Sequence, residues 1–312
     1  MSPKVKTFIE RGISTIILLG LLGGAVCWNN AIGYAILVCV LCNLTSYEWF
    51  NMLRERGKES NRGLALVVGL VYPWLMAAGM LMLNSEEHIA IIGGEDGPTS
   101  LFLASTFDFN SVALSALVLF VLATFFCELY RMDYKGSTGA QALSSAGITI
   151  LSFVYPVWLF AFALSTLCDP SAVYNLLWLV LATKMSDIWA YVSGVLLGGR
   201  FIKRKFSPAV SPKKTWEGII GSFIITSVCS WYLLPITGFC FEQTPLIFFC
   251  VVMPAIFMLS VTGDLAGSLI KRGVAIKDSG SLLPGIGGIF DLIDSPAFTV
   301  SFFAAAMPIL CL

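Results

Sequence analysis

The chain has 312 residues, of which 57% are hydrophobic and 12% are charged, and its mean hydropathy is +0.84. A soluble domain has roughly 45–50% apolar and about 25% charged residues, so a single water-soluble core cannot hold this much apolar surface. The net charge is zero, and the basic residues lie in short segments between apolar runs, which excludes a basic face for nucleic acid.

Apolar runs divide the chain into about nine candidate membrane spans. A spanning helix needs about 20 mostly apolar residues, and helices satisfy their own backbone groups in lipid. We therefore predict an all-α, polytopic integral membrane protein. The expected spans cover residues 11–28, 31–49, 63–83, 109–129, 145–167, 172–197, 218–238, 245–263 and 295–312.

The first run follows a basic N-terminus and could be mistaken for a signal peptide. No small-residue cleavage site ends it and another run follows at once, so we expect a retained span. We interpret the chain as one membrane domain. Residues 1–170 form N-terminal helices, and residues 171–312 form a catalytic region with polar loops.

Charged residues alternate between the gaps that separate the runs. Of the 19 lysines and arginines, all but Lys184, which lies inside an expected span, fall in or next to every second gap. The remaining gaps carry acids and no lysine or arginine. Because cytoplasmic loops are enriched in lysine and arginine, this alternation supports the nine-helix trace. It predicts a multi-pass protein of the plasma or inner membrane whose basic gaps face the cytoplasm.

Two charges lie three residues apart inside the 172–197 span. Lys184 and Asp187 either neutralise each other or line a functional cavity, since charged residues within spans usually face the protein interior. Glu48 and Glu128 lie near the ends of their spans, and we expect them at the water interface.

The segment SPAVSPKKTWEG, from Ser207 to Gly218, leads into a new span. Its two Ser-Pro pairs interrupt helix, and a helix start beside lysines is suited to binding anions. We predict that Ser211, Lys213 and Lys214 contact a phosphate. A solvated basic loop is the alternative.

The last basic gap and the spans beside it hold the acids with the clearest chemical potential. In VTGDLAGSLIKRGVAIKDSGSLLPGIGGIFDLID, Asp264 and Asp291 are candidates for binding a divalent cation. Asp294 follows Asp291 by three positions and shares its helix face. The alternative is that these aspartates cap helices, Asp294 above all.

The same gap contains a candidate phosphate-binding face. Ser268, Lys271 and Arg272 have the i, i+3, i+4 spacing of one helix face, and Lys277 and Asp278 follow. The positive-inside rule alone also explains these cations. The glycines nearby favour a ligand, because they let the backbone approach it closely.

The run from Ser268 to Asp294 resembles the signature of the phosphatidate cytidylyltransferases, or CDP-diacylglycerol synthases. That signature reads S-x-x-K-R-x4-K-D-x-G-x-x-x-P-G-H-G-G-x-x-D-R-x-D. The upstream D-I-W-A-Y-x-x-G, S-P-K-K-T-W-E-G and T-G-D are also similar, so the resemblance covers about residues 184–294. Ile286 and Leu292 stand where the family has histidine and arginine.

The resemblance implies transfer of a cytidylyl group from CTP to phosphatidic acid in phospholipid biosynthesis, with Mg²⁺ as cofactor, by a homodimer in the bilayer. It implies catalytic roles for Asp264, Asp291, Asp294 and Lys271, with Asp264 and Asp291 as metal ligands. The implied substrate-binding residues are Ser211, Lys213, Lys214, Asp187, Ser268, Arg272, Lys277 and Asp278.

Two alternatives remain open at this point. The first is another CTP-dependent membrane enzyme, either a lipid kinase or a cytidylyltransferase for a different lipid. The second is a sodium-coupled transporter, because IGGEDGPTS at residues 92–100 resembles a sodium-site segment of the membrane decarboxylase pumps. A glycine-rich turn explains that segment equally well.

Overall fold

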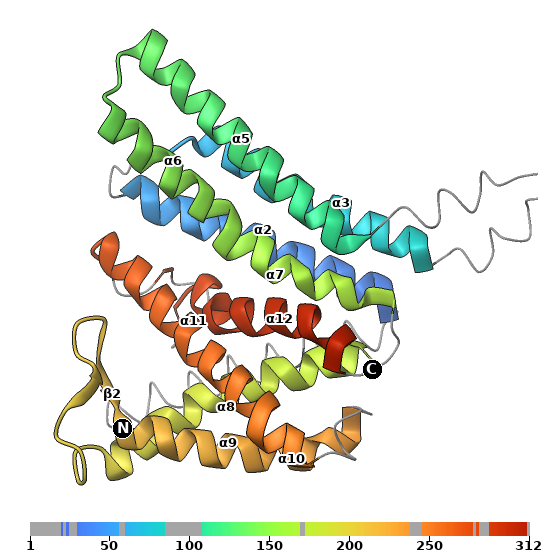
Figure 1. The fold of residues 1–312 in the computed structure, drawn as a ribbon, viewed down its shortest axis with the longest axis vertical. Coiled ribbons are helices and arrows are strands. Elements are labelled where there is room, and N and C mark those ends of the chain that lie inside the picture. The colour runs from blue at the N-terminus through green and yellow to red at the C-terminus, as the bar shows by residue number, and fades with distance from the viewer. Residues whose placement is uncertain are drawn as a thin grey trace, which may run out of the picture.

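The protein folds as a bundle of long helices (Figure 1). The computed structural model describes residues 20, 23–24, 30–55, 60–84, 108–168, 172–237, 245–276, 279–280 and 287–310. Its main elements are α2 (Asn30–Glu55), α3 (Arg62–Asn84), α5 (Phe109–Lys135), α6 (Gly139–Phe153), α7 (Leu159–Ala161), α8 (Ala172–Leu197), β1 (Lys205–Ser207), β2 (Ser211–Thr215), α9 (Trp216–Thr237), α10 (Pro245–Ile247), α11 (Met253–Gly273) and α12 (Phe290–Leu310).

Seven described segments are long and apolar enough to cross a membrane, and they coincide with seven of the nine expected spans. They are Ala31–Arg54, Arg62–Met82, Phe109–Lys135, Gly139–Leu167, Tyr174–Leu197, Trp216–Pro235 and Pro245–Gly273. The first expected span lies almost entirely outside the described residues. The last corresponds to α12, which is not among the seven. The all-helical, multi-pass fold is confirmed, whereas a count of nine is not.

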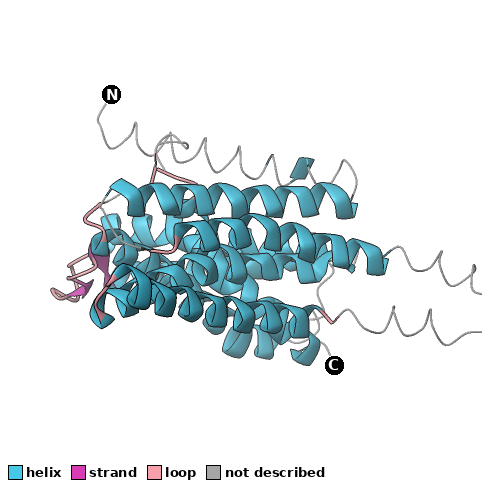
Figure 2. Ribbon diagram, turned by 90° about the horizontal axis from the view of Figure 1, so that it is seen from above, coloured by secondary structure: helices cyan, strands magenta, loops and turns pink. Residues whose placement is uncertain are grey.

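The described connections gather at one end of the bundle. The ends of α2, α5, α8 and α11 and the starts of α3, α6, α9 and α12 meet there, and a hairpin of β1 and β2 projects from the same end (Figures 1 and 2). The two strands are antiparallel, with Lys205 opposite Thr215 and Ser207 opposite Ser211. The predicted interruption of helix at the Ser-Pro pairs therefore takes the form of a short hairpin.

The hairpin joins α9 through two side chains of the predicted phosphate segment. The Thr215 hydroxyl accepts the backbone N–H of Gly218 at 3.1 Å, which satisfies one free donor of the helix start. Glu217 accepts the backbone N–H groups of Gly199, Phe201 and Ile202 at 3.1, 3.1 and 2.8 Å. These bonds tie the chain before β1 to the first turn of α9.

The span Gly139–Leu167 changes its helical winding at Pro156. A π-helical turn, Val154–Trp158, connects α6 to α7, and Pro156 removes a backbone donor within it. Such turns are frequent at functional sites, since they redirect a side chain. Here the turn carries Tyr155, whose hydroxyl reaches α11 and α12.

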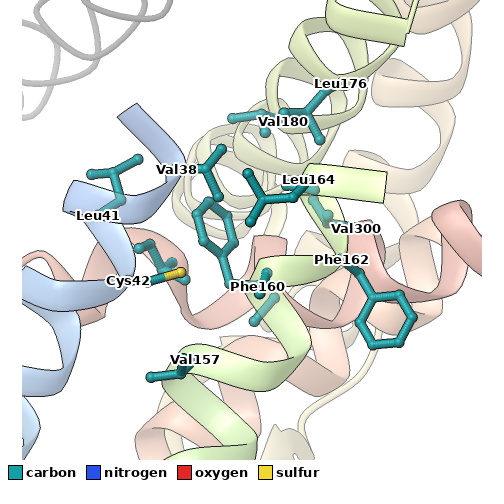
Figure 3. Packing of buried hydrophobic residues seen from close by; sticks show 14 of the residues in the cluster. Val38, Leu41, Cys42, Val157, Phe160, Phe162, Leu164, Leu176, Val180 and Val300 are labelled. Atoms are coloured by element: carbon teal, nitrogen blue, oxygen red, sulfur yellow. The ribbon is translucent and has the colours of Figure 1, made fainter. Parts of the chain in front are cut away.

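The apolar core lies between α2, the Gly139–Leu167 span, α8 and α12. Figure 3 shows Val38 of α2, Phe160 and Leu164 of the central span, Val180 of α8 and Val300 of α12 packed together. Many large apolar side chains instead point outward, among them Leu75, Phe126 and Leu246, which are 64%, 75% and 75% exposed. In a membrane protein such side chains face lipid.

Small residues bring α8 and α9 into close contact. A Cβ added at Gly218 would lie 2.8 Å from the carbonyl oxygen of Ala190 and 3.1 Å from Cα of Gly194. One added at Gly221 would lie 2.8 Å from the Ser193 side chain. Glycine and serine at helix interfaces allow this close backbone approach in membranes. Helix α8 carries Asp187, and α9 begins two residues after Lys214. This contact therefore also affects where these two predicted substrate-binding residues lie.

We expect Gly218→Ala to lower the thermal stability of the detergent-purified protein by about 1–3 kcal/mol, because the new methyl group overpacks the α8–α9 contact. Gly147→Ala is the matched control, since a Cβ there meets nothing within 4 Å. The control should melt at or above the wild-type temperature, because alanine favours helix. Equal melting temperatures for the two variants would contradict the close contact.

Candidate active site

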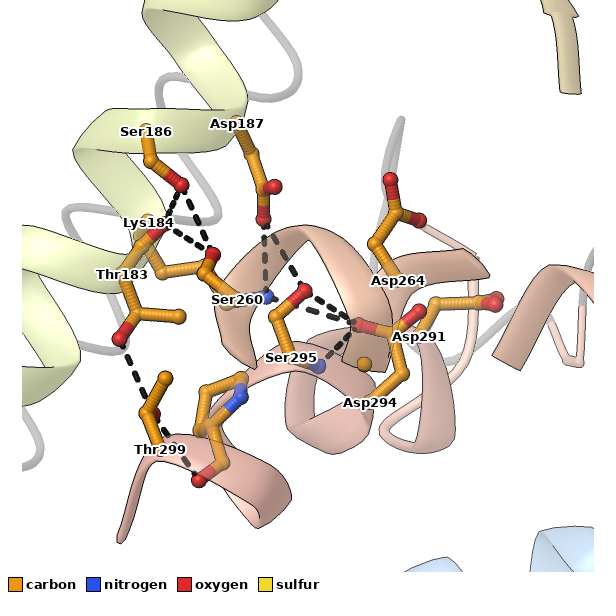
Figure 4. Close-up of polar contacts among 12 residues, drawn as sticks. Thr183, Lys184, Ser186, Asp187, Ser260, Asp264, Asp291, Asp294, Ser295 and Thr299 are labelled. Carbon is orange, nitrogen blue, oxygen red and sulfur yellow. Dashed lines mark hydrogen bonds and ion pairs between the residues drawn. The ribbon is translucent and has the colours of Figure 1, made fainter. Parts of the chain in front are cut away.

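Four aspartates and three lysines from three helices and the hairpin form one ionic cluster. The aspartates and the serines and threonines around them are drawn in Figure 4. Helix α8 contributes Lys184 and Asp187, α11 contributes Asp264 and Lys271, α12 contributes Asp291 and Asp294, and β2 contributes Lys214. The cluster therefore carries one more formal negative charge than positive.

Lys271 holds the deepest part of the cluster together. Its ammonium contacts Oδ1 of Asp291 and lies 3.8 Å from Oδ2 of Asp294. The three side chains are 10%, 8% and 5% exposed. Carboxylates buried this far need a cation and hydrogen bonds to offset lost hydration. The predicted shared face of Asp291 and Asp294 is confirmed by this common partner.

Lys184 makes the second bridge within the cluster. Its ammonium lies 3.7 Å from Oδ2 of Asp187 on its own helix and 3.9 Å from Oδ1 of Asp294 on α12. The pair expected inside the 172–197 span does form, and it also joins a larger set of charges. The expected pairing is therefore confirmed, whereas a functional cavity at this position stays a prediction.

Lys214 ties the hairpin to α11. Its ammonium lies 2.6 Å from Oδ2 of Asp264, with side-chain exposures of 16% and 28%. Asp187, at 33%, and Asp264 are the most exposed carboxylates of the cluster. The cluster thus opens toward Asp187, Asp264 and Lys214, and is closed around Asp291, Asp294 and Lys271.

Two glycines of α11 permit α12 to approach. A Cβ at Gly263 would lie 2.6 Å from the carbonyl oxygen of Asp294, and one at Gly267 would lie 2.8 Å from Cβ of Asp294. Asp264 sits between these glycines, well inside α11 rather than at the end of a span. The T-G-D motif therefore sets the distance between two helices that both carry carboxylates.

Hydroxyl groups hold the three helices in register below the charges. Ser186 of α8 and Ser260 of α11 are 2.8 Å apart, and Thr183 of α8 and Thr299 of α12 are 3.1 Å apart. All four are buried. Between helices such bonds replace water that the membrane lacks. They fix how the aspartates face one another.

Asp291 also organises the chain that precedes α12. Its Oδ2 accepts the backbone N–H of Ser279 at 2.9 Å, the Ser279 hydroxyl at 2.8 Å and the backbone N–H of Gly288 at 3.1 Å. Asp294 accepts the backbone N–H of Ser295 at 2.7 Å. Since α12 begins at Phe290, Asp294 lies inside the helix and is not its N-cap.

The other predicted substrate-binding residues that the structure describes differ in exposure. Ser211 and Ser268 are half-buried, whereas Lys213 and Arg272 are exposed. Arg272 donates to the carbonyl oxygen of Ile276 at 3.2 Å. Lys271 is buried, so the expected phosphate-binding face of Ser268, Lys271 and Arg272 is not uniformly exposed to solvent. Lys277, Asp278 and Ile286 lie outside the described residues.

Three buried polar side chains were missed or misplaced by sequence reasoning. Glu48 and Glu128, expected at the water interface, are buried at 4% and 3% exposure, so that expectation is wrong. Glu48 contacts the segment before α12, and Glu128 pairs with Arg131 at 3.1 Å. Tyr155 donates to the carbonyl oxygens of Gly263 at 3.0 Å and Asp294 at 3.3 Å. Their acidic or hydroxyl groups near or within apolar runs were the available signal.

The carboxylates of the cluster fit magnesium only if one or two of them bind it. Among the described residues, no group of three or more His, Cys, Asp or Glu side chains is arranged to hold a metal ion. Magnesium is commonly bound through one or two carboxylates, with water and phosphate oxygens completing its shell. Asp264 suits this role, because its side chain is 28% exposed and its ion pair with Lys214 engages Oδ2 alone. Asp291 would have to share an oxygen that already accepts hydrogen bonds.

Membrane-length helices that enclose paired carboxylates and lysines define a multi-pass membrane protein with a largely buried ionic cluster. Residues 9–310 match the model of the cytidylyltransferase family, and the chain therefore belongs to that family. The prediction of the family from its signature is confirmed.

Curated relatives agree with this assignment. The chain is 40% identical over 124 residues to a phosphatidate cytidylyltransferase of Haemophilus influenzae, which covers 38% of this chain and 41% of that protein. It is 34% identical over 174 residues to one of Helicobacter pylori, covering 55% and 61%. It is 28% identical over 299 residues to one of Pseudomonas aeruginosa, covering 96% of each. The matched part thus spans less than two thirds of the first two proteins and nearly all of the third.

Leu292, which replaces the arginine of the family signature, is buried in the apolar core at 5% exposure. Its neighbour Asp291 is held in the ionic cluster. The replacement therefore adds apolar packing to α12.

We expect Lys271→Met to lower the stability of the folded protein by about 3–5 kcal/mol, because Asp291 and Asp294 lose the ammonium that both contact. Thermal melting in detergent measures the change. Lys135→Met, at the exposed end of α5, is the control and should melt like the wild type. A Lys271→Met protein as stable as this control would show that the buried bridge does not hold α11 to α12.

Proposed function

We propose that this protein transfers the cytidylyl group of CTP to phosphatidic acid, giving CDP-diacylglycerol and pyrophosphate. The observation that carries the proposal is the cluster of four aspartates and three lysines on membrane helices, within a chain of the cytidylyltransferase family. A charged nucleotide and a lipid phosphate can meet only where a polar site borders the bilayer.

In the reaction, a phosphate oxygen of phosphatidic acid attacks the α-phosphorus of CTP. A new P–O bond forms, the bond from the α-phosphorus to its bridging oxygen breaks, and pyrophosphate leaves. The attacking phosphate is already ionised at neutral pH, so no general base is needed. The main catalytic task is to neutralise two anions that repel each other.

The exposed side of the cluster is suited to that task. Lys214 and Lys213 stand before the start of α9, where free backbone N–H groups also favour anions. We assign these lysines, with Arg272, to the phosphate groups of CTP. Lys271 keeps Asp291 and Asp294 in place, and Asp187 lines the polar opening.

Bound magnesium would supply positive charge to the phosphates and to the leaving pyrophosphate. We propose Asp264 as its main protein ligand and Asp291 as the second. Asp264 is the better placed of the two, because its side chain is 28% exposed while that of Asp291 is 8% exposed.

The proposal includes the orientation and assembly that the family resemblance implies. The basic residues of alternate gaps support a cytoplasmic site in the plasma or inner membrane. A homodimer is carried over from the family, and crosslinking in native membranes tests it directly.

Purified protein supplied with Mg²⁺, phosphatidic acid and CTP labelled at the α-phosphorus should give a labelled lipid. Asp264→Asn should abolish the labelled product, because one carboxylate charge is lost. Asp133→Asn, an exposed position at the end of α5, should retain wild-type activity.

The position of the label separates the rival enzymes. Label that enters lipid only from the γ-phosphorus of CTP indicates a lipid kinase and contradicts the proposal. Replacing phosphatidic acid by a polyprenyl phosphate tests a different cytidylyl acceptor. No labelled lipid from the unmodified protein under any of these conditions would falsify the assignment.

Chelation of divalent cations should stop the reaction, and added Mg²⁺ should restore it. Asp264→Glu is expected to keep activity at a higher Mg²⁺ requirement, because the carboxylate remains but its reach changes. The Mg²⁺ concentration giving half-maximal rate is the measurement. An unchanged value in this variant contradicts Asp264 as a metal ligand.

A further inference from the structure

Glu48 of α2 reaches across the bundle to the chain that leads into α12. Its Oε2 accepts the backbone N–H of Phe290 at 2.9 Å and lies 3.3 Å from the Ser279 hydroxyl. That hydroxyl makes a shorter contact, 2.8 Å, to Asp291. The segments around Ser279 and Phe290 are therefore held between a carboxylate from α2 and one from α12.

The backbone of these segments is wrapped closely around Glu48. A Cβ at Gly288 would lie 2.2 Å from Oε2 of Glu48, and one at Gly280 would lie 2.9 Å from Oε1. These two glycines are needed for the approach of the carboxylate and not only for a ligand. The glycine-rich signature thus encloses a side chain from the distant α2.

The neighbouring residue of α2 reinforces this contact. The Trp49 ring packs on Phe290 with centroids 5.4 Å apart and near Tyr155 at 6.2 Å, and its Nε1 donates to Ser152. Tyr155 in turn contacts Phe290 at 5.5 Å. The start of α12, which carries Asp291, therefore rests on side chains from the N-terminal part of the chain.

Stability alone explains this arrangement poorly. Oε1 of Glu48 is buried and has no hydrogen-bond partner within the described part of the chain. Glu48 makes no ion pair among those of the described residues, unlike the aspartates of the cluster. A half-satisfied buried carboxylate costs free energy, so its presence calls for an explanation other than stability.

We infer that Glu48 is a positioning residue for the transfer reaction, which holds the segments at 279–280 and 287–290 so that Asp291 faces Lys271. The inference rests on the proposed function. Glu48 acts through Phe290 and Ser279 and does not itself contact substrate. Its loss should therefore slow the chemical step more than it weakens CTP binding.

The test compares Glu48→Leu with Glu48→Gln. Leucine removes the acceptor for the Phe290 N–H, and kcat should fall at least about tenfold, with KM for CTP changed far less. Glutamine can place its amide oxygen at the Oε2 position, so it should recover most of kcat. Glu128→Gln is the matched control, since Glu128 is equally buried but pairs with Arg131 and Ser145, and it should leave kcat unchanged.

Two outcomes overturn the inference. Glu48→Leu with wild-type kcat shows that the contact is dispensable. Glu48→Gln as impaired as Glu48→Leu shows that the charge acts and not the bond to Phe290.

Hydrogen exchange separates this inference from the proposed function. In Glu48→Leu, the amide of Phe290 should exchange faster, while amides of α5 and α6 should keep wild-type rates. This measurement does not depend on turnover of CTP. A protein that made no lipid product would therefore still test whether Glu48 holds the segments at 279–280 and 287–290. Faster exchange in α5 and α6 as well means general unfolding and contradicts a local role.

A double-mutant cycle tests the geometry itself. Gly280→Ala should raise exchange at Phe290, because its methyl group meets Glu48. In the Glu48→Ala background the same change should have less effect, because the space is open. Gly280 is cleaner than Gly288 for this purpose, since a Cβ at Gly288 also meets the Ser279 hydroxyl at 2.2 Å. Additive effects would show that the glycine does not accommodate Glu48.

Discussion

The bridging of Asp291 and Asp294 by one buried lysine is the interaction on which the site depends. Lys271 joins α11 to α12, and Lys184 joins α8 to the same Asp294, so three helices share one chain of charges. Removing either lysine leaves its carboxylate partners with less positive charge in a poorly hydrated interior. The two lysines therefore have two effects. They hold α8, α11 and α12 together, and they offset the negative charge of the aspartates.

Glycine and serine make this charge sharing possible by bringing backbones together. Gly263 and Gly267 bring α12 against α11, and Gly218 brings α9 against α8. Without lipid-driven attraction between helices, close packing and interhelical hydrogen bonds supply much of the association. The large apolar side chains then serve mainly to face lipid or to fill the core around α2 and the central span. The polar motifs of the sequence are consequently packing motifs as well as chemical ones.

Features that depend on one segment could be predicted from the sequence, whereas contacts between distant segments could not. Hydropathy is a property of one segment, so seven spans were recognised, and the Lys184–Asp187 pair was visible from its spacing. The end of α11 was placed too early, because Asp264 interrupts its apolar run while remaining inside the helix. Glu48 was misplaced because its partners, Ser279 and Phe290, lie far along the chain. Glu128 was misplaced because only the folded chain brings Ser145 of α6 beside the local pair with Arg131. A carboxylate at the end of an apolar run was the available signal, but a carboxylate at the water interface gives the same signal.

The pairing of every cluster aspartate with a lysine has a consequence for how anionic substrates enter. Lys214 neutralises Asp264 at 2.6 Å, and both side chains are partly exposed. A phosphate group that draws Lys214 toward itself leaves the charge of Asp264 without its partner. A divalent cation restores the balance, and the same cation is attracted by the phosphate. Under the proposed function, nucleotide and metal should thus favour each other's binding through this one ion pair. The buried pairs around Lys271 lie deeper and keep α11 and α12 together while the exposed pair opens.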